Sequence, residues 1–406
     1  MAGSAIYDGK YITVRWATKG LDLSRVGLRW DPQREQWKGT YTPGLQGKLR
    51  QLGVQVHGFP GKDPSVSEIV KKFDQLYIPF NLPGDTYEHQ VFSFVVGTQI
   101  KRLPMILDMG LGKTYLACCL ARYRMEQKQV RKCLILTKAR IVHQWVDQWK
   151  TWNPDIPVIA PSGSVSSRLH EAANLTYGAV ILSYESFVLP KVGPKSKDLI
   201  KRVRAERFEG LDKFLWSMPG QMVVLDESTM VKNPTSSRSK EGTRICRVCD
   251  YATILTGFPV SNSVEELFGQ FLALDGGLTF GKSLPVFRSR FMRDVGGVFP
   301  RWIPKDDAPA RIKEILKDRG VRFTKDECLD LPDRTFEEVE VEFTEEQEVE
   351  YAKIQDDKEL TAIAKMGKLS QLSSGFVYEK DRVPRWVSGA KFEMLGDLLE
   401  SVEWGE

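Results

Sequence analysis

Residues 110–114 bring together side chains that suit phosphate binding. Gly110, Gly112, Lys113 and Thr114 follow an apolar run and precede a helical pattern. Glycines let the backbone close around a phosphate with its amides pointing inward. A lysine can reach the β- and γ-phosphates of a nucleotide, and a threonine hydroxyl can ligate Mg²⁺. The strict form of this loop has glycine where Leu107 stands, so a glycine-rich turn without a ligand is the alternative.

A pair of acidic residues further along the chain complements this loop. Asp226 and Glu227 follow the apolar run 222–225. A carboxylate at the end of a buried strand can hold the Mg²⁺ of a phosphate site. A second carboxylate beside it can orient and polarise the attacking water. The alternative is that Asp226 caps a helix, but the glycine-rich loop lies upstream in the expected order. Together the two motifs predict a site for ATP and Mg²⁺.

Apolar runs that alternate with helical stretches must position these residues. Such alternation predicts an α/β fold, in which a parallel sheet is covered by helices on both faces. Ligands of these sheets bind at the carboxyl ends of the strands, where both motifs stand. The expected strands are 104–108, 133–137, 179–183, 222–226 and 252–256, and the expected helices are 115–127, 141–149 and 264–274.

The first sixty residues predict a small β-rich module. One strand is expected over 11–16, and Asp31-Pro32 predicts a turn between two tryptophan-bearing strands. Trp30 and Trp37 would form the small core that such a module needs. Arg29 and Lys38 beside them remain candidates for nucleic-acid contact. A Pro/Gly-rich linker follows over 61–84.

Composition and charge limit the class of protein. The 406 residues are 42% hydrophobic and 27% charged, which is typical of a folded soluble protein. No apolar run reaches the ~18 residues of a membrane helix, and the N-terminus shows no signal peptide. Six cysteines in this length predict no disulfide framework. We therefore expect an intracellular protein with no membrane partner.

The net charge of +5 is unevenly distributed. Residues 1–72 and 281–325 are rich in Lys and Arg, whereas 326–360 are strongly acidic. The basic segments suit a polyanion such as DNA, and ordinary solvated surface is the alternative. Within the acidic segment, alternating Val and Phe over 337–350 predict a strand at a solvent edge.

The ordered motifs of residues 77–400 resemble the first RecA-like motor lobe of Swi/Snf-type superfamily 2 helicases and translocases. The motifs that carry the resemblance are Glu88-His89-Gln90 (glutamine motif), 108–114 (motif I), 137–145 (motif Ia), 182–185 (motif Ib), 226–236 (motif II and its extension), 255–267 (motif III), and 322–325 with 331–332. The resemblance also places the lobe over 85–280 and an extension toward a second lobe over 281–386.

The resemblance implies a role for each motif residue. ATP would bind through its adenine to Gln90 and through its phosphates to the P-loop. Hydrolysis would depend on Lys113, Asp226 and Glu227. The implied phosphate ligands are Gly110, Leu111, Gly112, Lys113 and Thr114; the implied Mg²⁺ ligands are Thr114 and Asp226; and the implied coupling or DNA-contacting residues are Thr256, Asn262, Lys138, Ser183, Arg29 and Lys38.

Three departures from the family pattern bear on function. Motif II usually continues Ala-His, but Ser228 and Thr229 stand here, and Phe258 replaces a threonine of motif III. The family's arginine finger lies in a Gln-x-x-Gly-Arg-x-x-Arg pattern of the second lobe, which this sequence lacks. Residues 387–406 resemble the start of that lobe, so a truncated chain, half of a split enzyme and a single-lobe relative are all open.

The expected function is that of an ATP-dependent DNA helicase or translocase acting on double-stranded or branched DNA. It would contact phosphates and need a second lobe in cis or in trans. The alternative is a single lobe that binds ATP and DNA but waits on a partner for turnover. A restriction-system motor is a third possibility, which the Lys232-Asn233 extension disfavours. Residues 27–32 with Trp37 also resemble the HARP-like domain of annealing helicases, which implies recognition of forked or junction DNA. Bacteriophage helicases of this type often carry such a module, so the resemblance implies the cytoplasm of a bacterial or phage-infected cell.

Overall fold

The computed structural model describes most of the chain, which divides into the compact units Met1–Leu331 and Pro332–Glu406. Each unit is considered by itself. The described residues are 4–7, 11–15, 22–33, 35–40, 45–52, 54–57, 63–187, 214–215, 217–260, 263–297, 300–329, 338–379 and 383–401.

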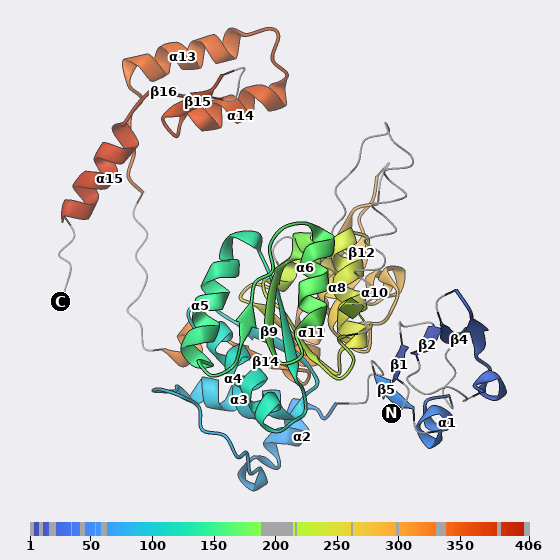
Figure 1. Ribbon diagram of the computed structural model, residues 1–406. Coiled ribbons are helices and arrows are strands. Elements are labelled where there is room, and N and C mark those ends of the chain that lie inside the picture. The colour runs from blue at the N-terminus through green and yellow to red at the C-terminus, as the bar shows by residue number, and fades with distance from the viewer. Residues whose placement is uncertain are drawn as a thin grey trace. The chain divides into compact units, whose positions relative to one another are not determined.

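A seven-stranded parallel sheet forms the centre of the first unit, in the order β14-β6-β11-β10-β7-β9-β8 (Figure 1). Its strands are β6 (Arg102–Leu107), β7 (Lys132–Thr137), β8 (Val158–Ile159), β9 (Gly178–Ser183), β10 (Met222–Leu225), β11 (Tyr251–Thr256) and β14 (Val321–Phe323). The predicted α/β sheet is confirmed. The lobe predicted over residues 85–280 leaves out β14, although β14 pairs directly with β6 in this sheet.

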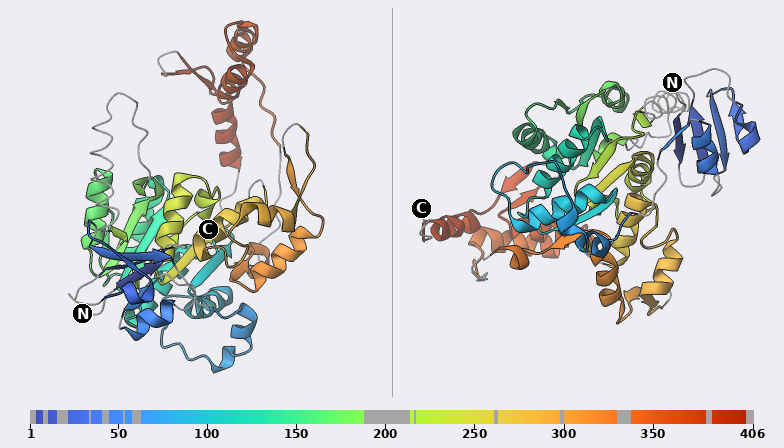
Figure 2. Two further views of the ribbon diagram at one scale, coloured as in Figure 1. Left: turned by 90° about the vertical axis from the view of Figure 1, so that its right-hand side faces the viewer. Right: turned by 90° about the horizontal axis from the view of Figure 1, so that it is seen from below.

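Helices cover both faces of the sheet (Figure 2). Alternate residues of β7 belong to two different cores: Leu134 and Leu136 pack on one face, Cys133 and Ile135 on the other. This alternation follows from the pleat, since successive side chains of a strand point to opposite faces. The helices are α2 (Val66–Val70), α3 (Glu88–Gln99), α4 (Lys113–Glu126), α5 (Val142–Trp152), α6 (Val165–Asn174), α8 (Ser237–Val248), α9 (Glu265–Asp275), α10 (Leu284–Phe291), α11 (Ala308–Lys317) and α12 (Lys325–Cys328). A hairpin of β12 (Met292–Asp294) and β13 (Trp302–Pro304) lies between α10 and α11.

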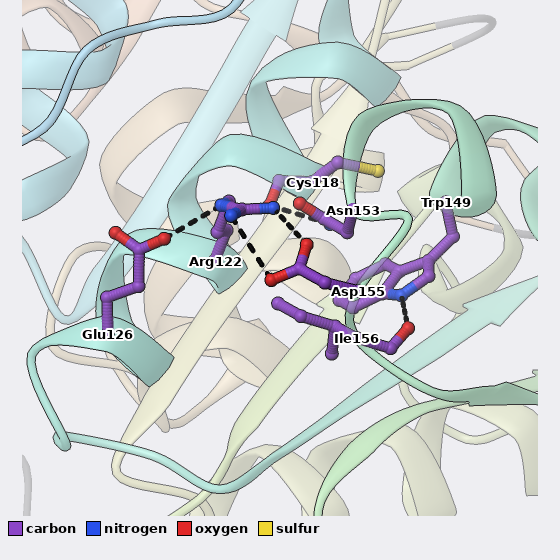
Figure 3. Close-up of polar contacts among 7 residues, drawn as sticks. All are labelled: Cys118, Arg122, Glu126, Trp149, Asn153, Asp155 and Ile156. Atoms are coloured by element: carbon purple, nitrogen blue, oxygen red, sulfur yellow. Dashed lines mark hydrogen bonds and ion pairs between the residues drawn. The ribbon is translucent and has the colours of Figure 1, made fainter.

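Side-chain hydrogen bonds fasten α4 to the loop that follows α5 (Figure 3). The Arg122 guanidinium donates to both carboxylate oxygens of Asp155, at 2.6 and 3.3 Å, and to Glu126 at 2.8 Å. The bond from Arg122 lowers the pKa of Asp155. Nearby, the buried Asn153 donates to the carbonyl of Cys118 at 3.3 Å. These contacts hold in place the helix whose first residue is Lys113.

The N-terminal module is a five-stranded sheet in the order β3-β4-β2-β1-β5, with one helix. It has the predicted hairpin, in which Trp30 lies opposite Trp37 with ring centroids 5.5 Å apart. Trp37 packs against the small core, as predicted, whereas Trp30 remains 45% exposed. The elements are β1 (Ser4–Tyr7), β2 (Tyr11–Arg15), β3 (Arg29–Asp31), β4 (Gln36–Thr40), α1 (Leu45–Gln51) and β5 (Gln55–His57).

The second unit is mainly helical, and here one expectation is wrong. Residues 345–350, expected in a strand, begin a helix instead. Thr344 caps this helix, since its hydroxyl accepts from the backbone N–H of Gln347 and the Gln347 side chain accepts from the N–H of Thr344. Glutamates in the first turn favour the helix because they lie near its positive end. The elements are α13 (Glu345–Asp356), α14 (Ala362–Leu372), β15 (Phe376–Tyr378), β16 (Pro384–Trp386) and α15 (Ala390–Ser401).

Across the described parts of both units, no helix combines the length and hydrophobicity that crossing a bilayer requires.

Candidate nucleotide site

The loop between β6 and α4 has a backbone that requires its glycines. Gly110 and Gly112 have φ of +91° and +82°, a region that side chains with a β-carbon rarely adopt. A β-carbon on Gly112 would also lie only 2.4 Å from the Gln90 Nε2 atom. The loop therefore turns sharply at two positions and opens directly into the N-terminus of α4, where free backbone N–H groups favour an anion.

Lys113 points back into this loop. Its ammonium donates to the carbonyl oxygens of Leu107 and Asp108, at 2.7 and 2.9 Å. Burial lowers the pKa of Lys113, while the negative charges of Glu227 and Asp226 oppose that change. The predicted lysine and the predicted acidic pair thus come close enough to act on one another, although Lys113 begins α4 and the acidic pair follows β10.

The start of α3 packs against the same loop. Gln90 is buried; its Nε2 donates to the Leu111 carbonyl at 3.5 Å, and its Oε1 accepts from the backbone N–H of Tyr87. The His89 ring shares the Leu111 carbonyl at 3.3 Å and stacks on Tyr87. The motif Glu88-His89-Gln90 predicted a role for Gln90 but none for the neighbouring His89.

Asp226 is buried at the carboxyl end of β10 and is held by three donors. The Thr137 hydroxyl and the Trp145 indole N–H both donate to its Oδ2 atom at 2.7 Å, and the Glu227 N–H donates to Oδ1 at 3.0 Å. The Tyr184 hydroxyl donates to the Asp226 backbone carbonyl. Motifs Ia and Ib thus supply Asp226 with partners that the sequence analysis did not identify.

Glu227 has an unusual backbone for a residue with a side chain. Its φ is +49°, in the left-handed region, a conformation that is costly and that concentrates at functional sites. The half-buried carboxylate lies 3.9 Å from the Lys138 ammonium. The chain therefore departs from the extended backbone of β10 at Glu227, directly after the buried Asp226.

A buried hydrogen-bond chain joins motif II to motif III. The Ser228 hydroxyl donates to Gln270 Oε1 at 2.6 Å, and Gln270 Nε2 donates to the Pro259 carbonyl at 2.6 Å. Ser228 and Gln270 are both fully buried. The serine that departs from the family pattern therefore fixes the loop after β11 relative to the acidic pair.

Replacement of Ser228 by alanine, the residue usual in the family, should destabilise the first unit. Gln270 Oε1 would lose its donor inside the protein, which costs about 1–3 kcal/mol. Thermal unfolding should show a lower Tm for Ser228→Ala, whereas Ser237→Ala, on the exposed start of α8, should leave Tm within error. Equal Tm values for the two variants would contradict this role of Ser228.

The predicted coupling and DNA-contacting residues have different environments. Thr256 is buried at the end of β11, and its hydroxyl has no hydrogen-bond partner among the described residues. Ser183 is buried, with its hydroxyl 3.3 Å from that of Ser186. Asn262 lies outside the described residues. In the N-terminal module, Arg29 and Lys38 lie directly opposite one another on the β3–β4 pair, both exposed.

The residues present fit a nucleotide with Mg²⁺. The loop offers backbone N–H groups and an ammonium for phosphate, and the glycine at 112 lets the Gln90 side chain approach the loop closely. Thr114, in the first turn of α4, and Asp226 offer the oxygen ligands that Mg²⁺ prefers. The Asp226 carboxylate accepts three hydrogen bonds, and its two oxygens have about four acceptor sites. It therefore retains capacity for a metal ion or its water.

Comparison with known proteins places the chain in a family. The SNF2-related domain matches residues 87–383. Protein p41 of Acyrthosiphon pisum secondary endosymbiont phage 1 is 22% identical over 337 residues, 77% of this chain and 68% of its own length. The “Probable ATP-dependent DNA helicase CHR12” of Arabidopsis thaliana is 30% identical over 169 residues, 40% of this chain and 13% of its own length.

Two further similarities concern longer proteins. The SWI/SNF-related matrix-associated actin-dependent regulator of chromatin subfamily A-like protein 1 of Xenopus tropicalis is 24% identical over 209 residues, 52% of this chain and 18% of its own length. The Sulfolobus solfataricus SWI2/SNF2 ATPase core, solved in complex with dsDNA, is 19% identical with a TM-score of 0.48, over 80% of this chain and 66% of that one. The chain thus spans less than a fifth of the plant and frog relatives. Since the SNF2-related domain covers more than half of its residues, the chain belongs to the SNF2-related domain family.

Proposed function

We propose that residues 85–329 form the first motor lobe of an ATP-dependent DNA translocase. The observation that carries the proposal is that a glycine-rich loop with Lys113 and the acidic pair Asp226–Glu227 meet at the carboxyl edge of one parallel sheet. Family membership and the helicase name of the Arabidopsis relative support it. The phage relative supports the expectation that the protein works in the cytoplasm of an infected bacterial cell.

The geometry suggests how each residue would act on ATP. Lys113 would exchange the carbonyls of Leu107 and Asp108 for phosphate oxygens, which carry more negative charge. Thr114 and Asp226 would hold Mg²⁺, which neutralises charge on the phosphates when bound. Glu227 would orient the attacking water, and the Lys138 ion pair would help to hold its carboxylate in place. Thr256, whose hydroxyl has no partner among the described residues, would report the nucleotide state to the DNA track.

A second RecA-like lobe is part of the proposal. The Gln-x-x-Gly-Arg-x-x-Arg pattern does not occur within the 406 residues. An arginine finger from another lobe, in cis or in trans, would therefore complete the site. Without it, the chain would act as the alternative function, an ATP- and DNA-binding module with slow turnover.

DNA is the proposed partner, bound mainly through its phosphates. Lys138 and Ser183 would lie along the DNA track of the lobe, and Arg29 and Lys38 would contact forked or junction DNA from the N-terminal module. Arg29 and Lys38 lie directly opposite one another on neighbouring strands and are both exposed, so one DNA phosphate could contact both side chains. Half-exposed Trp30 beside them offers a ring on which an unpaired base could stack.

Removal of these two charges should weaken binding to forked DNA more than to plain duplex. We expect Arg29→Ala/Lys38→Ala to lose about tenfold in affinity for a fork, since two phosphate contacts disappear. Deletion of residues 1–60 should lose at least as much. The measurement is a fluorescence-anisotropy titration of both DNAs at one fixed salt concentration.

The matched control is Lys48→Ala/Arg50→Ala, which removes the same charge from the exposed face of α1. An equal loss from both double variants, on both DNAs, would reduce the module to a general electrostatic aid. Failure of the unaltered chain to bind either DNA would overturn the proposed function itself.

A further inference from the structure

A second lysine reaches the nucleotide loop from a strand outside the predicted lobe. β14 runs parallel to β6, with Phe323 opposite Leu107, so both strands end at the same edge of the sheet. The chain then turns into α12, whose first residue is Lys325. The topology therefore delivers Lys325 beside the residues that follow β6, which are those of the glycine-rich loop.

Two hydrogen bonds join the backbone around Lys325 to Asp108, the first residue of the loop. The Asp108 N–H donates to the Phe323 carbonyl at 3.2 Å, which extends the β14–β6 ladder by one bond. The Lys325 N–H donates to Asp108 Oδ2 at 3.0 Å. In addition, Glu327 accepts from the Thr324 N–H at 2.8 Å and caps α12. Lys325 therefore holds a fixed position relative to Asp108.

The Lys325 side chain lies against Gly110. A β-carbon on Gly110 would be 3.5 Å from Lys325 Cε and 3.8 Å from its Nζ, and Gly110 itself is exposed. The ammonium is half-buried and has neither a hydrogen-bond acceptor nor an ion-pair partner among the described residues. Burial is the main cause of the lowered pKa of Lys113, and the positive charge of Lys325 adds to it.

We propose that the Lys325 ammonium binds the nucleotide polyphosphate on the Gly110 side of the loop. The inference rests on the proposed function, because it names a further ligand of the same site. Two ammonium groups beside one glycine-rich loop favour an anion that both can contact, and a polyphosphate carries enough charge for both. A DNA phosphate is less suited, because Lys325 is fastened to Asp108, the first residue of the nucleotide loop, and lies against its glycine.

The test is ATP affinity of the full 406-residue chain with Mg²⁺, measured by isothermal titration calorimetry. Lys325→Met keeps the length of the side chain and removes its charge; we expect about tenfold weaker ATP binding, which corresponds to about 1.4 kcal/mol. AMP affinity should change less than about twofold, since AMP lacks the β- and γ-phosphates. Lys325→Arg, which keeps the charge, should bind ATP within about threefold of the unaltered chain.

Two controls separate the possible failures. Lys317→Met removes a charge from the exposed end of α11 and should leave ATP affinity unchanged, and Lys113→Ala should weaken ATP binding about a hundredfold or more. If Lys325→Met binds ATP normally while Lys113→Ala does not, the inference is wrong and the proposed function stands. The inference is also wrong if Lys325→Met weakens duplex DNA binding instead, or if the arginine variant is as weak as the methionine one. Absence of ATP binding by the unaltered chain would overturn the proposed function.

Discussion

Lys113→Ala is expected to weaken ATP binding about a hundredfold or more, and to abolish hydrolysis under any condition in which the unaltered chain hydrolyses ATP. The ammonium makes two hydrogen bonds to loop carbonyls at 2.7 and 2.9 Å, so it is already held where phosphate would arrive. Each charge-assisted hydrogen bond contributes about 1.5–3 kcal/mol, and loss of two accounts for the expected factor. Calorimetric titration with ATP and Mg²⁺ measures it.

Glu227→Gln supplies the matched contrast for this experiment. Its carboxylate, which we propose orients the attacking water, is not held by the three donors that bind the Asp226 carboxylate. The amide keeps the shape and loses the basicity, so ATP affinity should stay within about threefold while turnover falls. If Glu227→Gln lost as much affinity as Lys113→Ala, Glu227 would be a binding residue. If Lys113→Ala bound ATP normally, the glycine-rich loop would not be the nucleotide site.

The sequence predicted the central strands well, because β7, β9 and β10 each contain four apolar residues in a row and β6 and β11 are apolar over most of their length. β8 and β14 were missed for a physical reason: they contain two and three residues, which is too few for a hydrophobic period to be recognised. Their place in the sheet depends on long-range pairing. Phe323 lies opposite Leu107 only because the chain returns to the edge of β6.

The motifs predicted which residues gather at the site but not which atoms meet. Thr137 and Trp145 stand 89 and 81 residues before Asp226, and both donate to the same carboxylate oxygen. A motif states that an indole is present at that position, whereas only the fold shows where its N–H points. The Ser228–Gln270 bond is similar, since a serine in place of alanine does not by itself indicate a partner 42 residues away.

The wrongly expected strand over residues 345–350 illustrates a competition between two signals. Alternating Val and Phe upstream favours a strand, whereas a threonine followed three residues later by glutamine is typical of a helix N-terminus. Thr344 and Gln347 form that reciprocal pair, and the glutamates between them stabilise the first turn. The local cap decided the structure, and the described strands of the second unit, β15 and β16, pair with each other and not with these residues.

The largest effect is expected from a second lobe. The 406-residue chain alone should bind ATP and duplex DNA but hydrolyse ATP very slowly, with little stimulation by DNA. An arginine finger contributes about 10³–10⁵ to turnover in related P-loop enzymes, and the pattern that carries it does not occur in this sequence. Addition of a lobe that contains Gln-x-x-Gly-Arg-x-x-Arg, fused or as a separate chain, should raise DNA-stimulated turnover by about 10³ or more.

The surface beside the nucleotide loop is consistent with a covering lobe. Met109 and Phe258 are 63% and 60% exposed, and they lie on neighbouring loops, since a β-carbon on Gly257 would be 3.7 Å from Met109 Cγ. Exposed apolar side chains at the mouth of a charged site favour burial by another protein surface.

The measurement for the second lobe is the steady-state ATPase rate with and without duplex DNA. The added lobe with both arginines of its motif changed to alanine is the control, and Glu227→Gln gives the background. Robust DNA-stimulated turnover by the chain alone would show that the arginine finger comes from within these 406 residues. Stimulation by the arginine-free lobe would show that closure of the site, rather than the arginine finger, limits the rate.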